Sequence, residues 1–159
     1  MRIEYQPIGI IHTPFENPVG MPIQPAGAAG ISGSVQLFPE YAAGLQDLAG
    51  FSHIILLYHF HRSAGFDLMT TPFMGKQEHG LFATRSPRRP NPIGFSTVKL
   101  ISIEGRFLYI EEVDMLNGTP LLDIKPYVPE FDRLKDCRTG WLERERGKVH
   151  NHKSDDRFR

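Results

Sequence analysis

The sequence contains few of the features that mark secreted or membrane proteins. Only one of its 159 residues, Cys137, is a cysteine, so no disulfide can form within the chain. The longest apolar run, "IILLY" at 54–58, is far shorter than the roughly 20 residues that a membrane span needs. The N-terminus also has no charged region followed by an apolar stretch and a cleavage site. We therefore expect a cytoplasmic protein with no membrane partner.

An excess of charge of either sign is also absent. The chain has 18 basic and 18 acidic residues, and its formal net charge is zero. This balance argues against binding to DNA or another polyanion over the whole surface, so a nucleic acid would have to meet a local basic patch. The charges are concentrated near the C-terminus, and residues 130–159 are predicted to form a solvated, partly helical or mobile extension.

Three common nucleotide and hydrolase motifs are missing. The glycines of "GAAGISG" at 27–33 do not have the GxGxxG spacing and follow no buried strand. The GxxxxGK[ST] phosphate loop and the GxSxG nucleophile motif are both absent from the sequence. A Rossmann-type cofactor site is therefore not expected.

What is present favours a mainly β protein. A long Pro/Gly-rich loop follows the first strand, a short amphipathic helix begins at Pro39 and ends near Gly50, and the apolar run at 51–61 predicts a strand buried on both faces. We predict a small antiparallel β-barrel with one or two short helices, a domain at 3–137 and a charged C-terminal extension at 138–159. The segments with strand character are 5–12, 34–38, 51–61, 80–84, 97–103 and 106–116.

Two polar segments of limited flexibility follow predicted strands. In "ATRSPRRPNPIG" three prolines stiffen a loop whose arginines, Arg85, Arg88 and Arg89, could bind a carboxylate or a phosphate. An exposed turn with solvated arginines is the alternative. In "VDMLNGTPLLDIKPY" two aspartates, Asp114 and Asp123, bracket a turn, and Asp123 could equally form a surface ion pair with a nearby lysine. Because both polar segments occur in one small domain, each at a strand end, we favour a binding site there.

The histidines raise the question of a metal. His59 and His61 would lie on one face of a strand, a spacing that some metal sites use. No carboxylate or cysteine stands at ligand spacing beside them, so we predict hydrogen-bonded histidines and no metal, with a small-molecule contact from His61 left open.

Several segments together resemble one known family. They are "YQPIGIIHTPF", "PIQP", "GLQDLAGFSHIILLYHFHRS", "GLFATRSPRRPNPIG" and "LNGTPLLDIKPYVPEFD". This set is similar to the TsaA-like, or TrmO-type, S-adenosylmethionine-dependent tRNA methyltransferases, from about residue 3 to about residue 135. The resemblance implies a β-barrel that binds S-adenosylmethionine as a homodimer. It also implies methylation of the exocyclic nitrogen of threonylcarbamoyl-adenosine, next to the tRNA anticodon.

The resemblance also implies roles for individual residues. Asp114 and His61 are the candidate catalytic bases, with the substrate's own threonyl carboxylate as a third possibility. Substrate contacts are expected from Arg88, Arg89, Asn91 and Lys125, the two arginines facing anticodon-loop phosphates or the threonyl carboxylate. The expected cofactor contacts are Gln24, His61, Arg62, Arg85, Phe95, Asp114, Met115, Leu116 and Asn117.

The chain departs from the family pattern in two places. The usual "DGTP" is "NGTP" here, which removes a carboxylate at Asn117, and the longer relatives carry a C-terminal domain where this chain has its charged extension. Three other hypotheses stay open: a dimeric module that binds S-adenosylmethionine without catalysis, a methyltransferase with a different small or RNA substrate, and a small metal-dependent enzyme built on His59 and His61.

Overall fold

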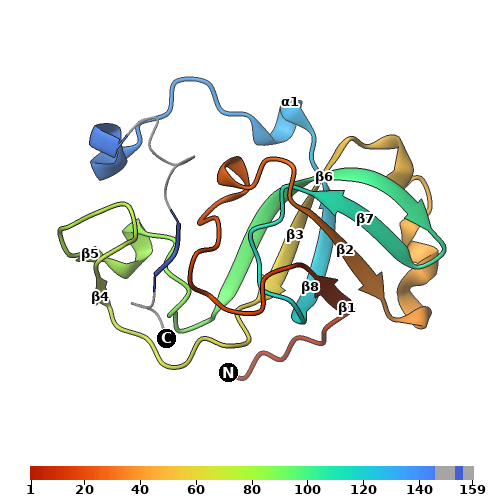
Figure 1. Ribbon diagram of the computed structural model, residues 1–159, viewed down its shortest axis with the longest axis horizontal. Helices are drawn as coiled ribbons and strands as arrows, with labels where there is room; N and C mark the ends of the chain where they lie inside the picture. The colour runs from red at the N-terminus through yellow and green to blue at the C-terminus, as the bar shows by residue number, and fades with distance from the viewer. Residues whose placement is uncertain (146–152, 156–159) are drawn as a thin grey trace.

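A closed antiparallel barrel of six strands forms the core of the protein. The computed structural model describes residues 1–145 and 153–155. The strands follow one another around the barrel in the order β1, β2, β7, β6, β3 and β8 (Figure 1). Their bounds are β1 Gly9–His12, β2 Ser32–Leu37, β3 His53–His59, β6 Ile93–Glu104, β7 Phe107–Glu111 and β8 Thr119–Pro126.

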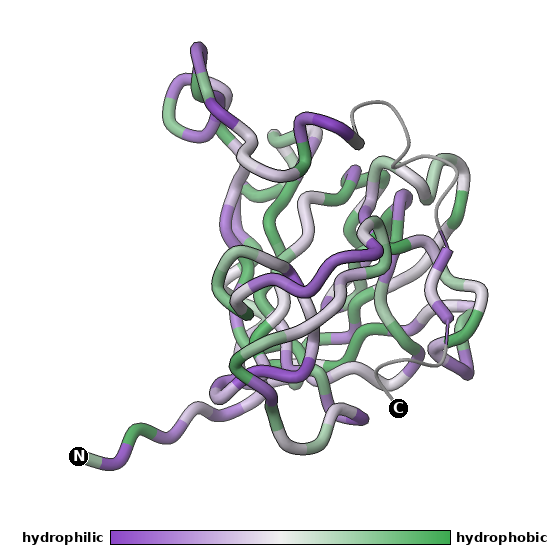
Figure 2. Tube along the Cα trace, turned by 90° about the vertical axis from the view of Figure 1, so that its left-hand side faces the viewer, coloured by the Kyte–Doolittle hydropathy of each residue, from purple (hydrophilic) through white to green (hydrophobic). Residues whose placement is uncertain are grey.

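Side chains alternate between the barrel interior and its outer face. Along β3, Ile54, Leu56 and Tyr58 are buried, and the residues between them are half-buried. The prediction that this strand is buried on both faces is therefore wrong, because a barrel strand turns only every second side chain inward. Figure 2 shows polar and apolar residues alternating along the chain, with the first residues extending away from the rest of the molecule.

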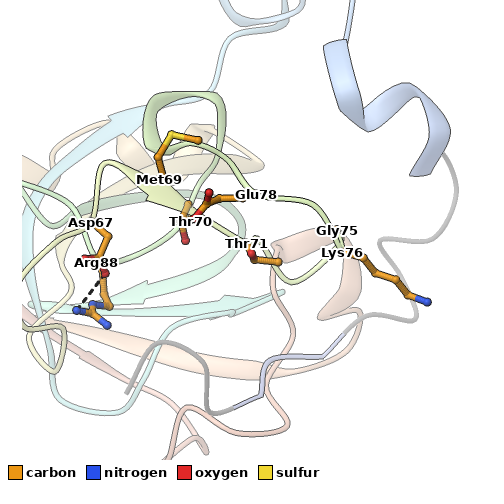
Figure 3. Close-up of a pocket in the computed structure, with 8 residues that line it drawn as sticks. All are labelled: Asp67, Met69, Thr70, Thr71, Gly75, Lys76, Glu78 and Arg88. Atoms are coloured by element: carbon orange, nitrogen blue, oxygen red, sulfur yellow. Dashed lines mark ion pairs between the residues drawn. The ribbon is translucent and has the colours of Figure 1, made fainter.

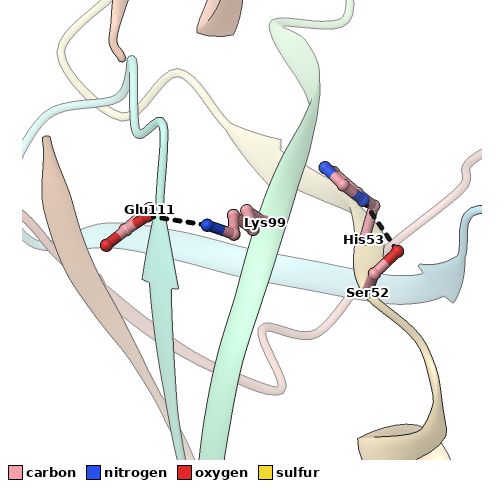
Figure 4. Close-up of polar contacts among 4 residues, drawn as sticks. All are labelled: Ser52, His53, Lys99 and Glu111. Carbon is pink, nitrogen blue, oxygen red and sulfur yellow. Dashed lines mark hydrogen bonds and ion pairs between the residues drawn. The ribbon is translucent and has the colours of Figure 1, made fainter. Parts of the chain in front are cut away.

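Glu104 and Gly105 separate the two strand segments predicted at 97–103 and 106–116, and the structure forms the β6–β7 hairpin there. Glu104 pairs with Phe107, so the loop consists of Gly105 and Arg106, and Gly105 has the positive φ of 60° that such a turn requires. On the outer face, Nζ of Lys99 lies 3.4 Å from Oε2 of Glu111 across the two strands (Figure 4). Figure 4 also shows the hydrogen bond between Ser52 and His53 where β3 begins.

The predicted amphipathic helix is two short 3-10 helices instead. These are η2, Pro39–Leu45, and η3, Leu48–Gly50. The chain leaves helical geometry between them, because Asp47 adopts a left-handed φ of 66°. Only Leu45 of these two helices is buried, so a short turn is enough to place the apolar side chains on the barrel.

The predicted strand at 80–84 is also wrong. Residues 79–80 form β5, His79–Gly80, which pairs with β4, Met69–Thr70, and the chain then enters η4, Leu81–Ala83. Leu81 and Thr84 are buried and the two residues between them are exposed, which is the spacing of a three-residue turn. The β4–β5 pair lies beside the barrel (Figure 1).

The described part of the C-terminal extension contacts the rest of the molecule. Nε1 of Trp141 donates to the carbonyl of Ala83, and the indole stacks on His79 at 4.4 Å. Ser154 exchanges backbone hydrogen bonds with Gly20 and Met21. None of the helices within residues 1–145 and 153–155 is long and apolar enough to cross a membrane. The remaining helices are η1 Pro25–Gly27, α1 Pro129–Asp132 and η5 Gly140–Glu145.

Candidate functional site

The segment between β7 and β8 carries most of the predicted site. Glu112 follows β7 with a left-handed φ of 68°, which turns the chain, and the amide of Gly118 donates to the carbonyl of Ile11. The hydroxyl of Thr13 donates to the carbonyl of Met115 at 2.8 Å. Residues 113–118 are thereby fastened to the loop after β1, which holds their side chains in place at the barrel end.

Asp114 belongs to a chain of three hydrogen-bonded side chains. The hydroxyl of Ser96, on β6, donates to Oδ1 of Asp114 at 2.6 Å. The hydroxyl of Tyr58, on β3, lies 3.0 Å from the same Ser96 oxygen. Ser96 and Tyr58 are buried, with 1% and 4% of their surface exposed. The carboxyl group is therefore supported from the barrel interior.

The environment of Asp114 changes its acidity. Burial raises the pKa of its carboxyl from 3.8 to about 7, although the Ser96 hydrogen bond and the charge of Arg85 act in the opposite direction. This raised pKa lies near neutral pH, which suits a residue that accepts a proton during a reaction. Burial also raises the pKa of Tyr58, so its hydroxyl stays protonated.

Arg85 lies beside this carboxyl on the exposed side. Nη1 of Arg85 donates to Oε1 of Gln24 at 2.8 Å, and the guanidinium lies 4.8 Å from the centre of the Phe95 ring. Arg85 is exposed and 45% of the Phe95 surface is accessible. The structure thus brings together four of the residues predicted to contact the cofactor: Gln24, Arg85, Phe95 and Asp114.

A second group of predicted residues meets around Glu16. The amide of Asn117 donates to Oε1 of Glu16 at 2.8 Å, and Nη1 of Arg62 donates to the carbonyl oxygen of Glu16 at 2.6 Å. Asn117 also accepts from the amide of Thr13. A carboxylate, that of Glu16, thus lies beside Asn117.

His61 lies at the edge of this second group. Its Nδ1 is 3.4 Å from the Thr119 hydroxyl, which donates to the carbonyl of Leu116 at 2.8 Å. Burial lowers the pKa of His61, and the charges of Arg62 and His59 add to that effect. The imidazole is neutral at pH 7 and could accept a proton. Within the described residues, no three His, Cys, Asp or Glu side chains are grouped as metal ligands.

The three arginines of the proline-rich loop point in different directions. Arg89 is turned back onto its own loop, where Nη1 donates to the carbonyls of Thr84 and Ser86. Nη2 of Arg88 lies 3.3 Å from Oδ2 of Asp67. Of these three arginines, only Arg85 reaches the group around Asp114.

Arg88 lines a cavity of about 520 Å³ beside the β4–β5 pair (Figure 3). Its Nε atom is buried and has no hydrogen-bond partner among the described residues. Figure 3 shows the paired Arg88 and Asp67 at one end of the cavity and Lys76 at the other. Of the residues predicted from the sequence, Arg88 alone contributes to this cavity. Its lining consists of Asp67, Met69, Thr70, Thr71, Gly75, Lys76, Glu78 and Arg88.

Two predicted substrate contacts lie elsewhere. Nζ of Lys125 pairs with Oδ2 of Asp123 at 2.7 Å, and both side chains are exposed. Lys125 is opposite Ile55 in the sheet, on the face that alternates away from the buried Leu56 and Ser96. Asn91 is exposed in the loop before β6. Lys125 is thus outside the buried network of Tyr58 and Ser96, on the outer face that also carries Phe95.

Comparison with known proteins identifies the family. Residues 10–133 match the family model of the tRNA-methyltransferase O N-terminal domain. The chain belongs to the tRNA-methyltransferase O family. This confirms the resemblance found in the sequence, and the predicted enzyme class, a tRNA methyltransferase, is that of the family.

Relatives and solved structures agree with this assignment. A "Probable S-adenosyl-L-methionine-binding protein" from Pyrococcus abyssi is 53% identical, over 99% of this chain and 86% of its own length. A "tRNA (adenine(37)-N6)-methyltransferase" from Rattus norvegicus is 36% identical, over 80% of this chain and 31% of its own length. The crystal structure of TrmO from Pseudomonas aeruginosa superposes with a TM-score of 0.75 at 37% identity.

The solved structure confirms the barrel prediction for this family member. The superposition covers 89% of this chain and 63% of the Pseudomonas chain, so this protein spans less than two thirds of that relative. The sequence comparison with the rat enzyme is shorter still, at about a third of that protein's length. The family-model match, residues 10–133, runs from β1 through β8.

Sequence reasoning missed three polar residues of the site. Ser96 and Tyr58 lie on strands and show no motif, although the alternation along β3 and β6 places both inside the barrel. A polar side chain at an inward position is the signal that could have identified them. Glu16 gave no signal, because its contact with Asn117 joins residues 101 positions apart.

Proposed function

We propose that this protein transfers a methyl group from S-adenosylmethionine to the exocyclic nitrogen of threonylcarbamoyl-adenosine in tRNA. The observation that carries the proposal is the convergence of Gln24, Arg85, Phe95 and Asp114 in a chain that belongs to the tRNA-methyltransferase O family. The names of relatives from Pyrococcus abyssi and Rattus norvegicus support the cofactor and the adenine nitrogen, respectively.

The residues present fit the cofactor chemically. Arg85 uses one nitrogen for Gln24 and keeps other N–H groups for the carboxylate of the methionine part. The exposed ring of Phe95 offers a flat apolar surface for the adenine. Asp114 supplies a carboxyl oxygen that would attract the positively charged sulfonium. S-adenosylmethionine supplies the methyl group, and the protein has to position it and the accepting nitrogen in line.

The accepting nitrogen carries a proton that has to leave. Asp114, with a pKa of about 7, can take it up at neutral pH, and the neutral His61 is the competing acceptor. Met115 and Leu116 contribute through the backbone of the same segment, since their carbonyls accept from Thr13 and Thr119. On the side of His61, the proposed cofactor site is bounded by Glu16 together with its hydrogen-bond partners Asn117 and Arg62.

The tRNA would be held farther from the cofactor. Arg88 is the best candidate for the threonyl carboxylate or a loop phosphate, because its buried Nε has no hydrogen-bond partner in the part of the chain that the structure describes. Arg89 is used within its own loop. We also propose that the protein acts as a homodimer in the cytoplasm. Light scattering of the purified protein at several concentrations tests the dimer. The expected mass is twice the 18.1 kDa of one chain.

Transfer of labelled methyl groups tests the proposed function. Purified protein and labelled S-adenosylmethionine are incubated with tRNA from cells that lack this gene, and in parallel with tRNA that lacks threonylcarbamoyl-adenosine. Label in the first tRNA alone, recovered as the methylated nucleoside by mass spectrometry, is the expected result. Equal labelling of both, or no labelling of either, would contradict the choice of nucleoside.

The second candidate is a module that binds S-adenosylmethionine without transferring its methyl group. The name of the Pyrococcus abyssi relative describes binding alone, which favours this second function. Calorimetry separates the two functions: cofactor binding at micromolar concentration, with no methyl transfer to any tRNA fraction, would support the module.

A further inference from the structure

Two hydroxyl groups behind Asp114 have no role in the function described so far. Tyr58 comes from β3 and Ser96 from β6, and Leu56, not Tyr58, is the residue opposite Ser96 in the sheet. Their hydroxyls nevertheless meet at 3.0 Å, inside a barrel whose other large buried side chains are aliphatic. Burying two hydroxyl groups is costly unless they hydrogen-bond, so their pairing calls for an explanation.

Counting the available hydroxyl protons determines which group donates in each of the two hydrogen bonds between Tyr58, Ser96 and Asp114. The ionised carboxylate of Asp114 can only accept, so the single proton of the Ser96 hydroxyl is used on Oδ1 of Asp114. The Ser96 oxygen can then only accept from Tyr58, whose hydroxyl is the first donor of the chain. Ser96 thus holds Oδ1 of the carboxylate, and a backbone hydrogen bond at Asp114 itself also favours the charged form.

The packing around Tyr58 fixes its position. Its ring meets Phe60 edge to face at 5.5 Å. A Cβ atom at Gly94 would lie 2.3 Å from Cε2 of Tyr58, so only glycine leaves room for the ring there. The hydroxyl therefore cannot move away from Ser96 without disturbing the barrel, which makes the chain of hydrogen bonds a rigid support.

We propose that Tyr58 and Ser96 are positioning residues that hold Asp114 with Oδ2 toward the accepting nitrogen, and that Asp114 rather than His61 takes the proton. This rests on the proposed function, because the nitrogen belongs to the substrate proposed there. In the transfer, the bond between the methyl carbon and the sulfonium sulfur breaks and its electron pair stays on sulfur. The new bond forms between that carbon and the nitrogen, and the nitrogen's proton passes to Oδ2 of Asp114.

The charged groups around Asp114 determine how the network acts on its titration. Arg85, from the loop before β6, lowers the pKa of Asp114, and the hydrogen bond from Ser96 does the same; Tyr58, from β3, is the other titratable neighbour and stays neutral. Removing the Ser96 hydroxyl takes away support for the charged form, so the pKa of Asp114 rises. The enzyme then needs a higher pH to reach its full rate.

Single-turnover rates between pH 5 and 9 test the proposal. For Ser96→Ala we expect a rate about tenfold lower at pH 7, the size of one lost hydrogen bond to a charged group, and a rising limb displaced to higher pH. Tyr58→Phe removes one oxygen from an unchanged ring and should displace the limb less, in the same direction. Ser102→Ala on the outer face of β6 and Tyr109→Phe on the outer face of β7 are the matched controls.

A second readout separates this proposal from the proposed function. The Asp114 carboxyl is titrated by NMR in protein labelled at aspartate carboxyl carbons, with Asp114→Asn to assign the signal. If the wild-type protein transfers no methyl group but Ser96→Ala still raises the Asp114 midpoint, the proposed function fails and the support of the carboxyl by the hydroxyls stands. If the wild-type protein is active and neither variant moves the midpoint or the rate limb, the positioning role is wrong. If the His61→Ala variant lost the rising limb of the pH–rate profile, the assignment of the proton to Asp114 would likewise be wrong.

Discussion

The two parts of the molecule that could bind a small molecule are built in opposite ways. At the barrel end around Asp114, the polar groups are held by buried hydroxyls and by Gln24. The cavity beside the β4–β5 pair has a volume of about 520 Å³, and its charged groups pair with each other, as Asp67 and Arg88 do, or are exposed. The cavity and the hydrogen-bonded groups around Asp114 therefore lie in different places.

Side chains oriented by hydrogen bonds indicate a reactive site better than the volume of a cavity does. The charge of Arg85 lowers the pKa of Asp114, whereas no predicted catalytic residue lines the cavity. The predictions below test whether the barrel end does the chemistry and the cavity only contributes to tRNA binding.

Replacing Asp114 by Asn should have the largest effect. The amide cannot take up the proton, so kcat should fall by roughly 10²- to 10⁴-fold, the range typical of a lost general base. Methyl transfer under single-turnover conditions measures this, with Asp123→Asn on the outside of β8 as the control. An Asp114→Asn variant with near-normal kcat would remove the barrel end from the chemistry.

The same substitution should change how stability depends on pH. The pKa of Asp114 is about 7 in the folded protein, and its ordinary value, taken for the unfolded chain, is 3.8. Between pH 3.8 and pH 7 the folded state therefore binds more protons than the unfolded state does. The contribution of this group to stability is therefore present at low pH and lost as the pH rises to 7. Thermal melts from pH 4 to 8 should show a smaller decline for Asp114→Asn; identical slopes would contradict the raised pKa.

Replacing Arg85 by Ala should weaken cofactor binding while leaving the fold intact. The lost ionic hydrogen bonds should raise the Kd for S-adenosylmethionine by roughly 10- to 100-fold. The melting temperature should change little because Arg85 is exposed. Calorimetry measures the Kd, and Arg133→Ala, an exposed arginine after α1, is the control. Unchanged affinity would mean that the cofactor binds elsewhere.

Replacing Gly94 by Ala should act through the Tyr58 ring. The new methyl group would lie 2.3 Å from Cε2 of Tyr58, and relieving such a contact in a packed core costs about 1–3 kcal/mol. Denaturant unfolding measures the loss. Gly44→Ala, where nothing lies within 4 Å of the added atom, is the matched control. Equal stability of the two variants would show that the ring at Tyr58 moves freely.

Replacing Arg88 by Ala should have the smallest effect on the reaction. The KM for tRNA should rise by up to about fivefold, the size expected for a partly exposed ion pair, and the Kd for S-adenosylmethionine should not change. Lys99→Ala on the β6–β7 hairpin is the control. A loss of cofactor binding on replacing Arg88 would reverse the roles assigned to the two regions.

The sequence predicted the barrel, and four of the residues it proposed for the cofactor, Gln24, Arg85, Phe95 and Asp114, lie together in the structure. The β6–β7 hairpin follows from local turn chemistry, whereas the apolar run of β3 suggested burial on both faces because alternation does not show in a run of apolar residues. The errors lie where the local pattern was ambiguous: the helix predicted from Pro39 to Gly50 is interrupted at Asp47, and the strand predicted at 80–84 is mostly a 3-10 turn.

The rest of the site depends on contacts between distant parts of the chain. Ser96 meets Asp114 only because β6 and the segment after β7 lie together at one end of the barrel, and Glu16 meets Asn117 only through the loop after β1. The resemblance implies a substrate contact from Lys125, and the register of β8 places Lys125 on the outer face of the barrel beside Asp123, the face that also carries Phe95. No local pattern contains this information.

A crystal structure of the protein with S-adenosylhomocysteine, the demethylated cofactor, would test the comparison of the two regions most directly. The account predicts that its carboxylate pairs with Arg85 and that its sulfur lies on the Asp114 side of Phe95. A ligand seated between Asp67 and Lys76, in the cavity beside the β4–β5 pair, would contradict the account.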